Sequence, residues 1–346
     1  MADNPNAAST TSLVNGGGPF PGKVINAGLI TIDGINALSA LTGEDAAAFA
    51  GAPPAPPSGD NQTYGQSFPY DADRDQVLAA VDASDLGVTG SGITVGVLSD
   101  SFNDLGGAAA DEADGALPPA ADVDVLRDLG SGGTDEGRAM MQIVHDIAPG
   151  ADLDFYTADI SEQQFADGIL ALAAAGCKVI CDDVTYFDEP FFQTGIIAQA
   201  IQTVEQEGVI YLTAAGNDAD NGYQARWDPI ASTSFDVTPL SDTQDFGGGS
   251  AVETVTIGDT DGTSVPFVIE WNQPYGSATS DLKVLVFNNR HLYGTVTNDS
   301  ATGNIKLVEN EAGNPCIIFE LPGSVSEFSN VTYQIAIENL SGPNPG

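Results

Sequence analysis

Several side chains able to bind protons or bear charge follow strand-like segments in the middle of the sequence. They are Asp100, Glu136, Asp182, Asp183 and Asn217. Carboxyl groups that lie close together share a proton, so that one pKa rises above the other, and such a pair can act as a general acid or base. The elements that carry these residues must therefore bring them to one place.

The surrounding segment alternates predicted strands with predicted helices. The predicted strands are 93–99, 122–126, 151–157, 177–183 and 209–215, and the predicted helices are 134–146, 161–175 and 195–207. In the first helix, Met140, Ile143, Val144 and Ile147 are predicted to form one apolar face. Apolar strands between helices favour an α/β fold with a doubly wound parallel sheet covered on both faces. Ligands of such sheets gather at the carboxyl ends of strands, where the polar residues above lie.

Composition changes along the chain predict three parts. Residues 1–71 are rich in Ala, Gly, Pro and Ser, and PPAPP at 53–57 cannot continue a helix or a central strand. We interpret 1–71 as a partly disordered leader or propeptide remnant, and 72–227 as the α/β domain. Residues 228–346 contain short alternating strands between turn residues, which favours an antiparallel, jelly-roll-like β-sandwich inserted as a second domain.

The charge of the chain excludes two classes of partner. The sequence has 49 acidic and 9 basic residues, a net charge of −40, which repels nucleic acid and anionic lipid. A salty habitat, an acidic working pH or bound cations would each explain this charge. The carboxylates are scattered rather than set in metal-loop spacing, so we predict no metal site and no cofactor. Calcium stays open, although DTDG at 259–262 lacks the later glutamate of a calcium loop and is predicted to be a turn.

Two of the three cysteines are close in sequence. Cys177 and Cys181 lie four residues apart in a predicted strand, which places them about 13 Å apart, too far for a disulfide. We therefore expect buried thiols that pack as small apolar side chains.

Three segments resemble subtilisin-like serine peptidases (subtilases). GSGITVGVLSDSFN at 90–103 is similar to the segment in which the catalytic aspartate ends the first core strand. TDEGRAMMQIVHDIAPGADL at 134–153 resembles the segment with a catalytic residue, Gly, a helix and Ala-Pro-Gly. VIYLTAAGN at 209–217 resembles the strand that ends in the oxyanion asparagine. Their order and spacing make the joint resemblance specific, and it covers about residues 72–217.

The resemblance implies site residues. Asp100 corresponds to the acidic member of the triad, and Asn217 would donate its side-chain amide to the oxyanion, a role typically worth about 10²–10³ in rate. Where subtilases have His-Gly-Thr, this chain has Glu136-Gly137-Arg138. A glutamate base resembles the sedolisins, acid-active relatives in which Glu and Asp lie four apart on one helix, whereas position 140 here is Met.

We therefore expect a hybrid site in which Asp100 and Glu136 share a proton and act as a base at roughly pH 4–5. Arg138 is expected to pair with a nearby carboxylate. Asp182 and Asp183 are expected to line the substrate cleft or to contribute a third acidic group.

The nucleophile is the open question in this resemblance. The family signature is Gly-Thr-Ser followed by small residues and Pro at the start of a buried helix. Gly262-Thr263-Ser264 makes Ser264 a candidate, but the following VPFVIEW reads as a strand, which favours a turn. The other expectation is that the nucleophile-bearing segment is missing from this chain.

The resemblance implies an acid-active serine endopeptidase that hydrolyses peptide bonds of a protein or peptide substrate outside the cell. No standard secretion signal is visible in residues 1–18, and the oligomeric state stays open. The alternative is a catalytically inactive, peptidase-like binding or structural protein. A nucleotide-binding enzyme is disfavoured, because Ser-Asp-Ser and no glycine-rich loop follows the predicted strand 93–99.

Overall fold

The computed structural model describes residues 10–13, 25–26, 88–216, 221–232, 240–258, 263–308, 312–324 and 330–345. The chain forms two compact units. The α/β unit comprises Lys23–Tyr186 and Gly195–Asn217, and the β unit comprises Met1–Gly22, Phe187–Thr194 and Asp218–Gly346. The domain boundaries drawn from composition stay predictions.

The α/β unit is built on a five-stranded parallel sheet, as the strand and helix pattern predicts. The strands are β3 (Thr94–Ser99), β4 (Val123–Arg127), β5 (Asp152–Thr157), β6 (Val179–Asp182) and β8 (Ile210–Thr213), in the order β4-β5-β3-β6-β8. The helices are α5 (Ala108–Asp114), α6 (Glu136–Ile147), α7 (Glu162–Ala175) and α8 (Ile196–Gln206). A short antiparallel pair joins β2 (Ile25–Asn26) to β7 (Val184–Thr185). Helix α5 was not predicted, because its seven residues are too few to show a helical period.

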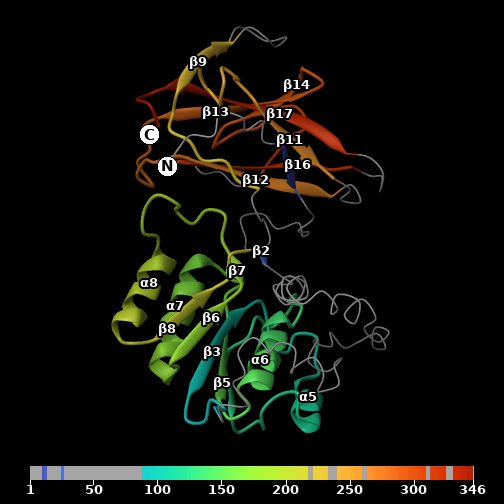
Figure 1. Cartoon of the computed structure of the whole chain (residues 1–346), viewed down its shortest axis with the longest axis vertical. Helices are drawn as coiled ribbons and strands as arrows, with labels where there is room; N and C mark the ends of the chain where they lie inside the picture. The colour runs from blue at the N-terminus through green and yellow to red at the C-terminus, as the bar shows by residue number, and fades with distance from the viewer. Residues whose placement is uncertain are drawn as a thin grey trace. The chain divides into compact units, whose positions relative to one another are not determined.

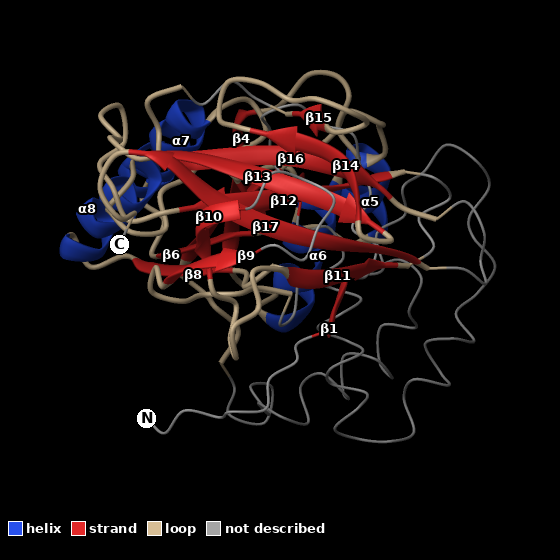
Figure 2. Ribbon diagram, turned by 90° about the horizontal axis from the view of Figure 1, so that it is seen from above, coloured by secondary structure: helices blue, strands red, loops and turns tan. Residues whose placement is uncertain are grey.

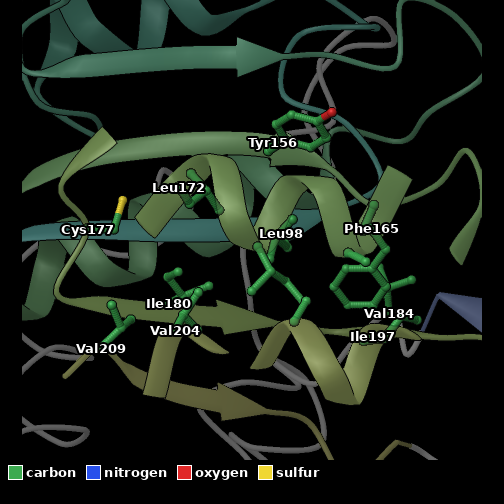
Figure 3. Close-up of a cluster of buried hydrophobic side chains, with 14 of the residues drawn as sticks. Leu98, Tyr156, Phe165, Leu172, Cys177, Ile180, Val184, Ile197, Val204 and Val209 are labelled. Carbon is green, nitrogen blue, oxygen red and sulfur yellow. The ribbon is translucent and has the colours of Figure 1, made fainter. Parts of the chain in front are cut away.

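Helices cover both faces of this sheet (Figure 1). Alternation along β3 sends Val95 and Val97 into a core with Met141 of α6, while Leu98 enters a second core with α7 and α8. Figure 3 shows Leu98 among Phe165, Ile197 and other side chains of that second core. The continuous apolar strands follow from this two-sided burial.

The predicted apolar face of α6 was partly wrong. Met140 and Val144 pack against the core only in part, and the fully buried positions are Gly137, Arg138, Met141 and Gln142. The hydrophobic pattern missed this face because two of its four members are polar. The burial of Arg138 depends on ion pairs, which hydrophobic periodicity does not register.

The β unit contains two sheets. The larger holds β1 (Thr10–Leu13), β9 (Pro229–Ser232), β10 (Leu240–Gln244), β11 (Glu253–Ile257), β13 (Asp281–Asn288), β14 (His291–Val296) and β17 (Val331–Ser341). The smaller, in the order β12-β16-β15, holds β12 (Ser264–Glu270), β15 (Lys306–Leu307) and β16 (Cys316–Pro322). Among the described strands of this unit, the pairs are antiparallel except β1 with β11.

One hydrophobic core joins these two sheets. Val284 and Val286 of β13 and Ile335 of β17 pack with Ile317 and Phe319 of β16. The sheets lie one over the other in Figures 1 and 2. The predicted antiparallel region after the α/β part is therefore present.

Two leucines of the parallel sheet offer a matched test of this packing. Leu98 is fully buried, whereas Leu212 of β8 is 56% exposed. We expect Leu98→Ala to lower the free energy of unfolding by about 2–5 kcal/mol, because it leaves a cavity between β3 and α7. Leu212→Ala should change it by less than about 1 kcal/mol in urea denaturation. Equal losses for the two variants would contradict the assignment of the core.

Candidate functional site

The carboxylate of Asp100 lies at the carboxyl end of β3 and is only 3% exposed. Its Oδ2 accepts hydrogen bonds from the backbone N–H (2.5 Å) and the hydroxyl (2.7 Å) of Thr134, and its Oδ1 accepts the N–H of Glu136 at 3.0 Å. The N–H of Ser101 also donates to Oδ1. A residue that ends one strand therefore satisfies the free N–H groups at the start of α6.

The N-cap of α6 explains why another element must supply this carboxylate. Asp135 has φ 60° and ψ 27°, a left-handed conformation in which its side chain makes no cap bond to α6. Its Oδ1 instead accepts the backbone N–H groups of Asp104 (2.7 Å) and Leu105 (3.2 Å). The start of α6 is thus held on one side by Asp100 and on the other by the loop after β3.

Arg138 connects the start of α6 to the loop after β3 and to α5. Its guanidinium is 1% exposed and pairs with Asp135 (Nη1 to Oδ2, 2.5 Å) and with Asp111 of α5 (Nε to Oδ2, 2.8 Å). Nη1 also donates to the carbonyl of Phe102 at 2.7 Å. The expected pairing of Arg138 with a carboxylate is confirmed, and two carboxylates share it.

Gly137 allows α6 to lie against the end of β3. A Cβ at this position would meet Cε2 of Phe155 at 2.3 Å and the carbonyl oxygen of Ser101 at 2.8 Å. Any larger residue would push the helix start away from the strand. Glycine after the glutamate is therefore a steric requirement for holding Glu136, which is half-buried, beside the end of β3.

Asp182 ends β6, the strand next to β3. Leu98 and Asp182 are register partners, so the two strands end at the same edge of the sheet. The hydroxyl of Thr213 donates to Oδ1 of Asp182 at 2.9 Å. Burial raises the pKa of Asp182 to about 6. Interactions with Tyr211, Thr213 and the backbone of Val184 lower this pKa and so oppose the effect of burial.

Asp183 follows directly and faces the other side of the sheet. Val179 and Cys181, two and four residues before it, pack toward the α6 core, and strand alternation assigns Asp183 to that side. Its side chain is 1% exposed, and neither carboxyl oxygen has a partner with hydrogen-bond geometry. Burial is the main cause that raises the pKa of Asp183 well above its usual range, and the charge of Glu136 is the next.

Four of the six predicted site residues therefore meet at one edge of the α/β unit. They are Asp100, Glu136, Asp182 and Asp183. Asn217 lies outside the described residues. Ser264 begins β12 in the β unit and is the register partner of Pro322, so the segment after it is a strand and not a helix. The roles assigned to these residues stay predictions.

Sequence reasoning missed the residues that support this site. Thr134 binds Asp100 through both its N–H and its hydroxyl, and Asp104 and Asp128 accept backbone N–H groups of the surrounding loops. The position of Thr134 as the first residue of a predicted helix was a usable signal for a polar contact at the helix start. Nothing in the sequence pattern pointed to the two loop aspartates.

Three further observations concern metal ligands, cysteines and membrane-spanning helices in the described residues. No group of three or more His, Cys, Asp or Glu side chains in the described ranges has an arrangement that could hold a metal ion. Cys177, Cys181 and Cys316 are free cysteines. Cys177 is buried as expected, whereas Cys181 is half-buried. Among the helices of the described part, none is long and apolar enough to cross a membrane.

Comparison with protein-family models finds no family that matches the chain. A search of curated proteins finds no relative either.

The hydrogen bonds of Asp100 give a test of how the site is held. We expect Asp100→Asn to lower the free energy of unfolding by about 2–3 kcal/mol, because an amide replaces a buried charged acceptor of several N–H groups. Asp122→Asn is the matched control, since Asp122 is exposed and just precedes β4. Urea denaturation at pH 7 compares the two variants, and an equally small effect of both would show that Asp100 does not anchor α6.

Proposed function

We propose that the chain carries the acid–base part of an acid-active serine-type endopeptidase. The observation that supports this most is the hydrogen bonding of Asp100 to the start of α6, which holds Glu136 at the edge where β3 and β6 end. Three segments similar to subtilases converge on this same α/β unit, and Glu136 takes the place of the histidine. The parallel sheet with both faces covered fits this proposal without being specific to it.

In the proposed reaction, the carboxylate of Glu136 accepts the proton of a serine hydroxyl while the serine oxygen forms a bond to the peptide carbonyl carbon. The carbon–nitrogen bond then breaks, and Glu136 returns the proton to the leaving amine. Water releases the acyl group by the same steps in reverse. Asn217 would donate to the oxyanion, and Asp100 fixes the helix that carries the base.

The serine in this scheme is not one of the two that flank Asp100. Ser99 and Ser101 are both fully buried, so a peptide carbonyl does not reach them. On the sheet, Ile210 and Leu212 of β8 are 59% and 56% exposed. Their register partners are Val179 and Cys181, so they lie on the α6 side. We propose that the segment carrying the nucleophile packs on this apolar surface, next to the base.

The acidic surface fits work at low pH, where protonation would neutralise part of the net charge of −40. As part of the same proposal, the protein is secreted and its substrate is a protein or peptide. The competing possibility, a peptidase-like binding or structural protein without catalysis, predicts the opposite outcome in the following experiment.

A fluorophosphonate probe that reacts with activated serines tests the proposal. We expect the protein, in the form that its gene encodes, to be labelled at one serine with a maximum below pH 6. Glu136→Gln should lower the labelling rate by at least about 10²-fold, because the proton acceptor is lost. Mass spectrometry then identifies the labelled serine.

Glu162→Gln is the control, because Glu162 lies in the first turn of α7 rather than at the start of α6. It should label at the rate of the unchanged protein. No labelling at any pH between about 3 and 8, from folded protein, would overturn the peptidase proposal in favour of the non-catalytic alternative.

A further inference from the structure

Asp183 is a buried carboxyl for which the reaction proposed above has no use. We infer that Asp183 shares a proton with Glu136 and so acts as a positioning residue for the general base. This inference rests on the proposed function for its catalytic meaning, although the sharing of the proton itself can be tested without activity.

Asp100 is poorly placed to share that proton. Its two oxygens already accept three backbone N–H groups and the hydroxyl of Thr134. Glu136 contributes its backbone N–H to this set, so Asp100 binds the main chain of Glu136. A carboxylate surrounded by donors acts as an acceptor and has little free capacity for a proton shared with another carboxyl.

Asp183 has the opposite surroundings. Both its oxygens are buried without a partner in hydrogen-bond geometry. The ionisable groups whose charges act on it are Glu136 from α6, Asp182 and Cys181 from β6, and Asp100 from the end of β3. The carboxyls among them raise the pKa of Asp183, in addition to burial, whereas the Ser99 hydroxyl lowers it. A buried carboxyl facing other carboxyls is stable when it carries the proton.

Unequal burial decides which member of the pair holds the proton. Asp183 is 1% exposed, whereas Glu136 is half-buried, so solvent favours the charge on Glu136. With one proton in the pair, Asp183 is neutral and Glu136 is a carboxylate able to accept a serine proton. The pair then carries one negative charge in place of two. Ionisation of Asp183 would set two like charges against each other and displace the Glu136 side chain from its working position.

The sign of the effect on stability follows from the raised pKa of Asp183. The folded protein binds this proton more tightly than the unfolded chain, whose aspartates have a pKa of about 3.9. The stabilisation that this proton contributes is complete below about pH 3.9, and it is lost as the pH rises through the pKa of Asp183 in the folded protein. Glu136→Gln removes the negative charge that repels an ionised Asp183. The variant should therefore be more stable than the unchanged protein at pH 8, with no such difference near pH 4.

A double-mutant cycle measures this coupling. Urea denaturation at pH 4 and pH 8 would compare the unchanged chain, Glu136→Gln, Asp183→Asn and the double variant. We expect Glu136→Gln to raise the folding equilibrium constant about tenfold at pH 8, as one pKa unit of coupling implies. In the Asp183→Asn background, this gain should vanish.

Asp182→Asn is the matched control background, because the adjacent Asp182 is also a buried aspartate but lies on the other face of the sheet. The gain from Glu136→Gln should persist there. A gain of the same size with and without the Asp183 carboxyl would overturn the inference. If Asp183→Asn does not fold, Asp183→Ser provides the same comparison with a smaller neutral side chain.

The labelling profile separates this inference from the proposed function. If the proposed function and the shared proton are both correct, Asp183→Asn leaves unchanged the pH at which the labelling rate rises on the acidic side. The pH at which the rate falls on the alkaline side then moves up by at least one unit. If the double-mutant cycle shows coupling but no serine is labelled, the shared proton stands and the peptidase proposal is rejected. If Asp183→Asn is labelled with the same fall in rate at alkaline pH as the unchanged protein, the peptidase proposal stands and the role of Asp183 is rejected.

Discussion

The contact between the Asp100 carboxylate and the first N–H groups of α6 is the constraint on which the candidate site depends. It links the end of the central strand to the start of the helix that carries Glu136. Gly137 lets the two elements approach, and Arg138 locks the helix start to the loop after β3 and to α5. Without this contact, the distance between Glu136 and the carboxyls of β6 would not be fixed.

The strongly acidic composition has a structural use at this edge. Asp104, Asp128 and Asp135 accept backbone N–H groups of the loops around the site, so these side chains help to fix the loop conformation. Asp183 differs, because it is buried beside Glu136 without donors in hydrogen-bond geometry. The site thus combines carboxylates that stabilise loops with a carboxyl that favours the protonated form.

Much of the α/β architecture could be predicted from sequence, because apolar strands between helices with clear period carry strong signals. The convergence of Asp100, Glu136 and Asp183 followed from the rule that strand ends meet at one edge. The buried face of α6 did not, since Arg138 and Gln142 are polar and their burial depends on partners distant in sequence. The protonation of Asp183 also escaped prediction, because it depends on burial and on a charge 47 positions away in the sequence.

Infrared spectroscopy of the folded protein at pH 7 can show whether Asp183 holds the shared proton, because a protonated carboxyl absorbs at a different frequency from a carboxylate. We expect the spectrum of the unchanged protein minus that of Asp183→Asn to contain a protonated-carboxyl band. In the Glu136→Gln background, the same difference band should weaken, since the repelling charge is gone. A difference spectrum showing a carboxylate at position 183, or a band indifferent to Glu136, would contradict the shared proton.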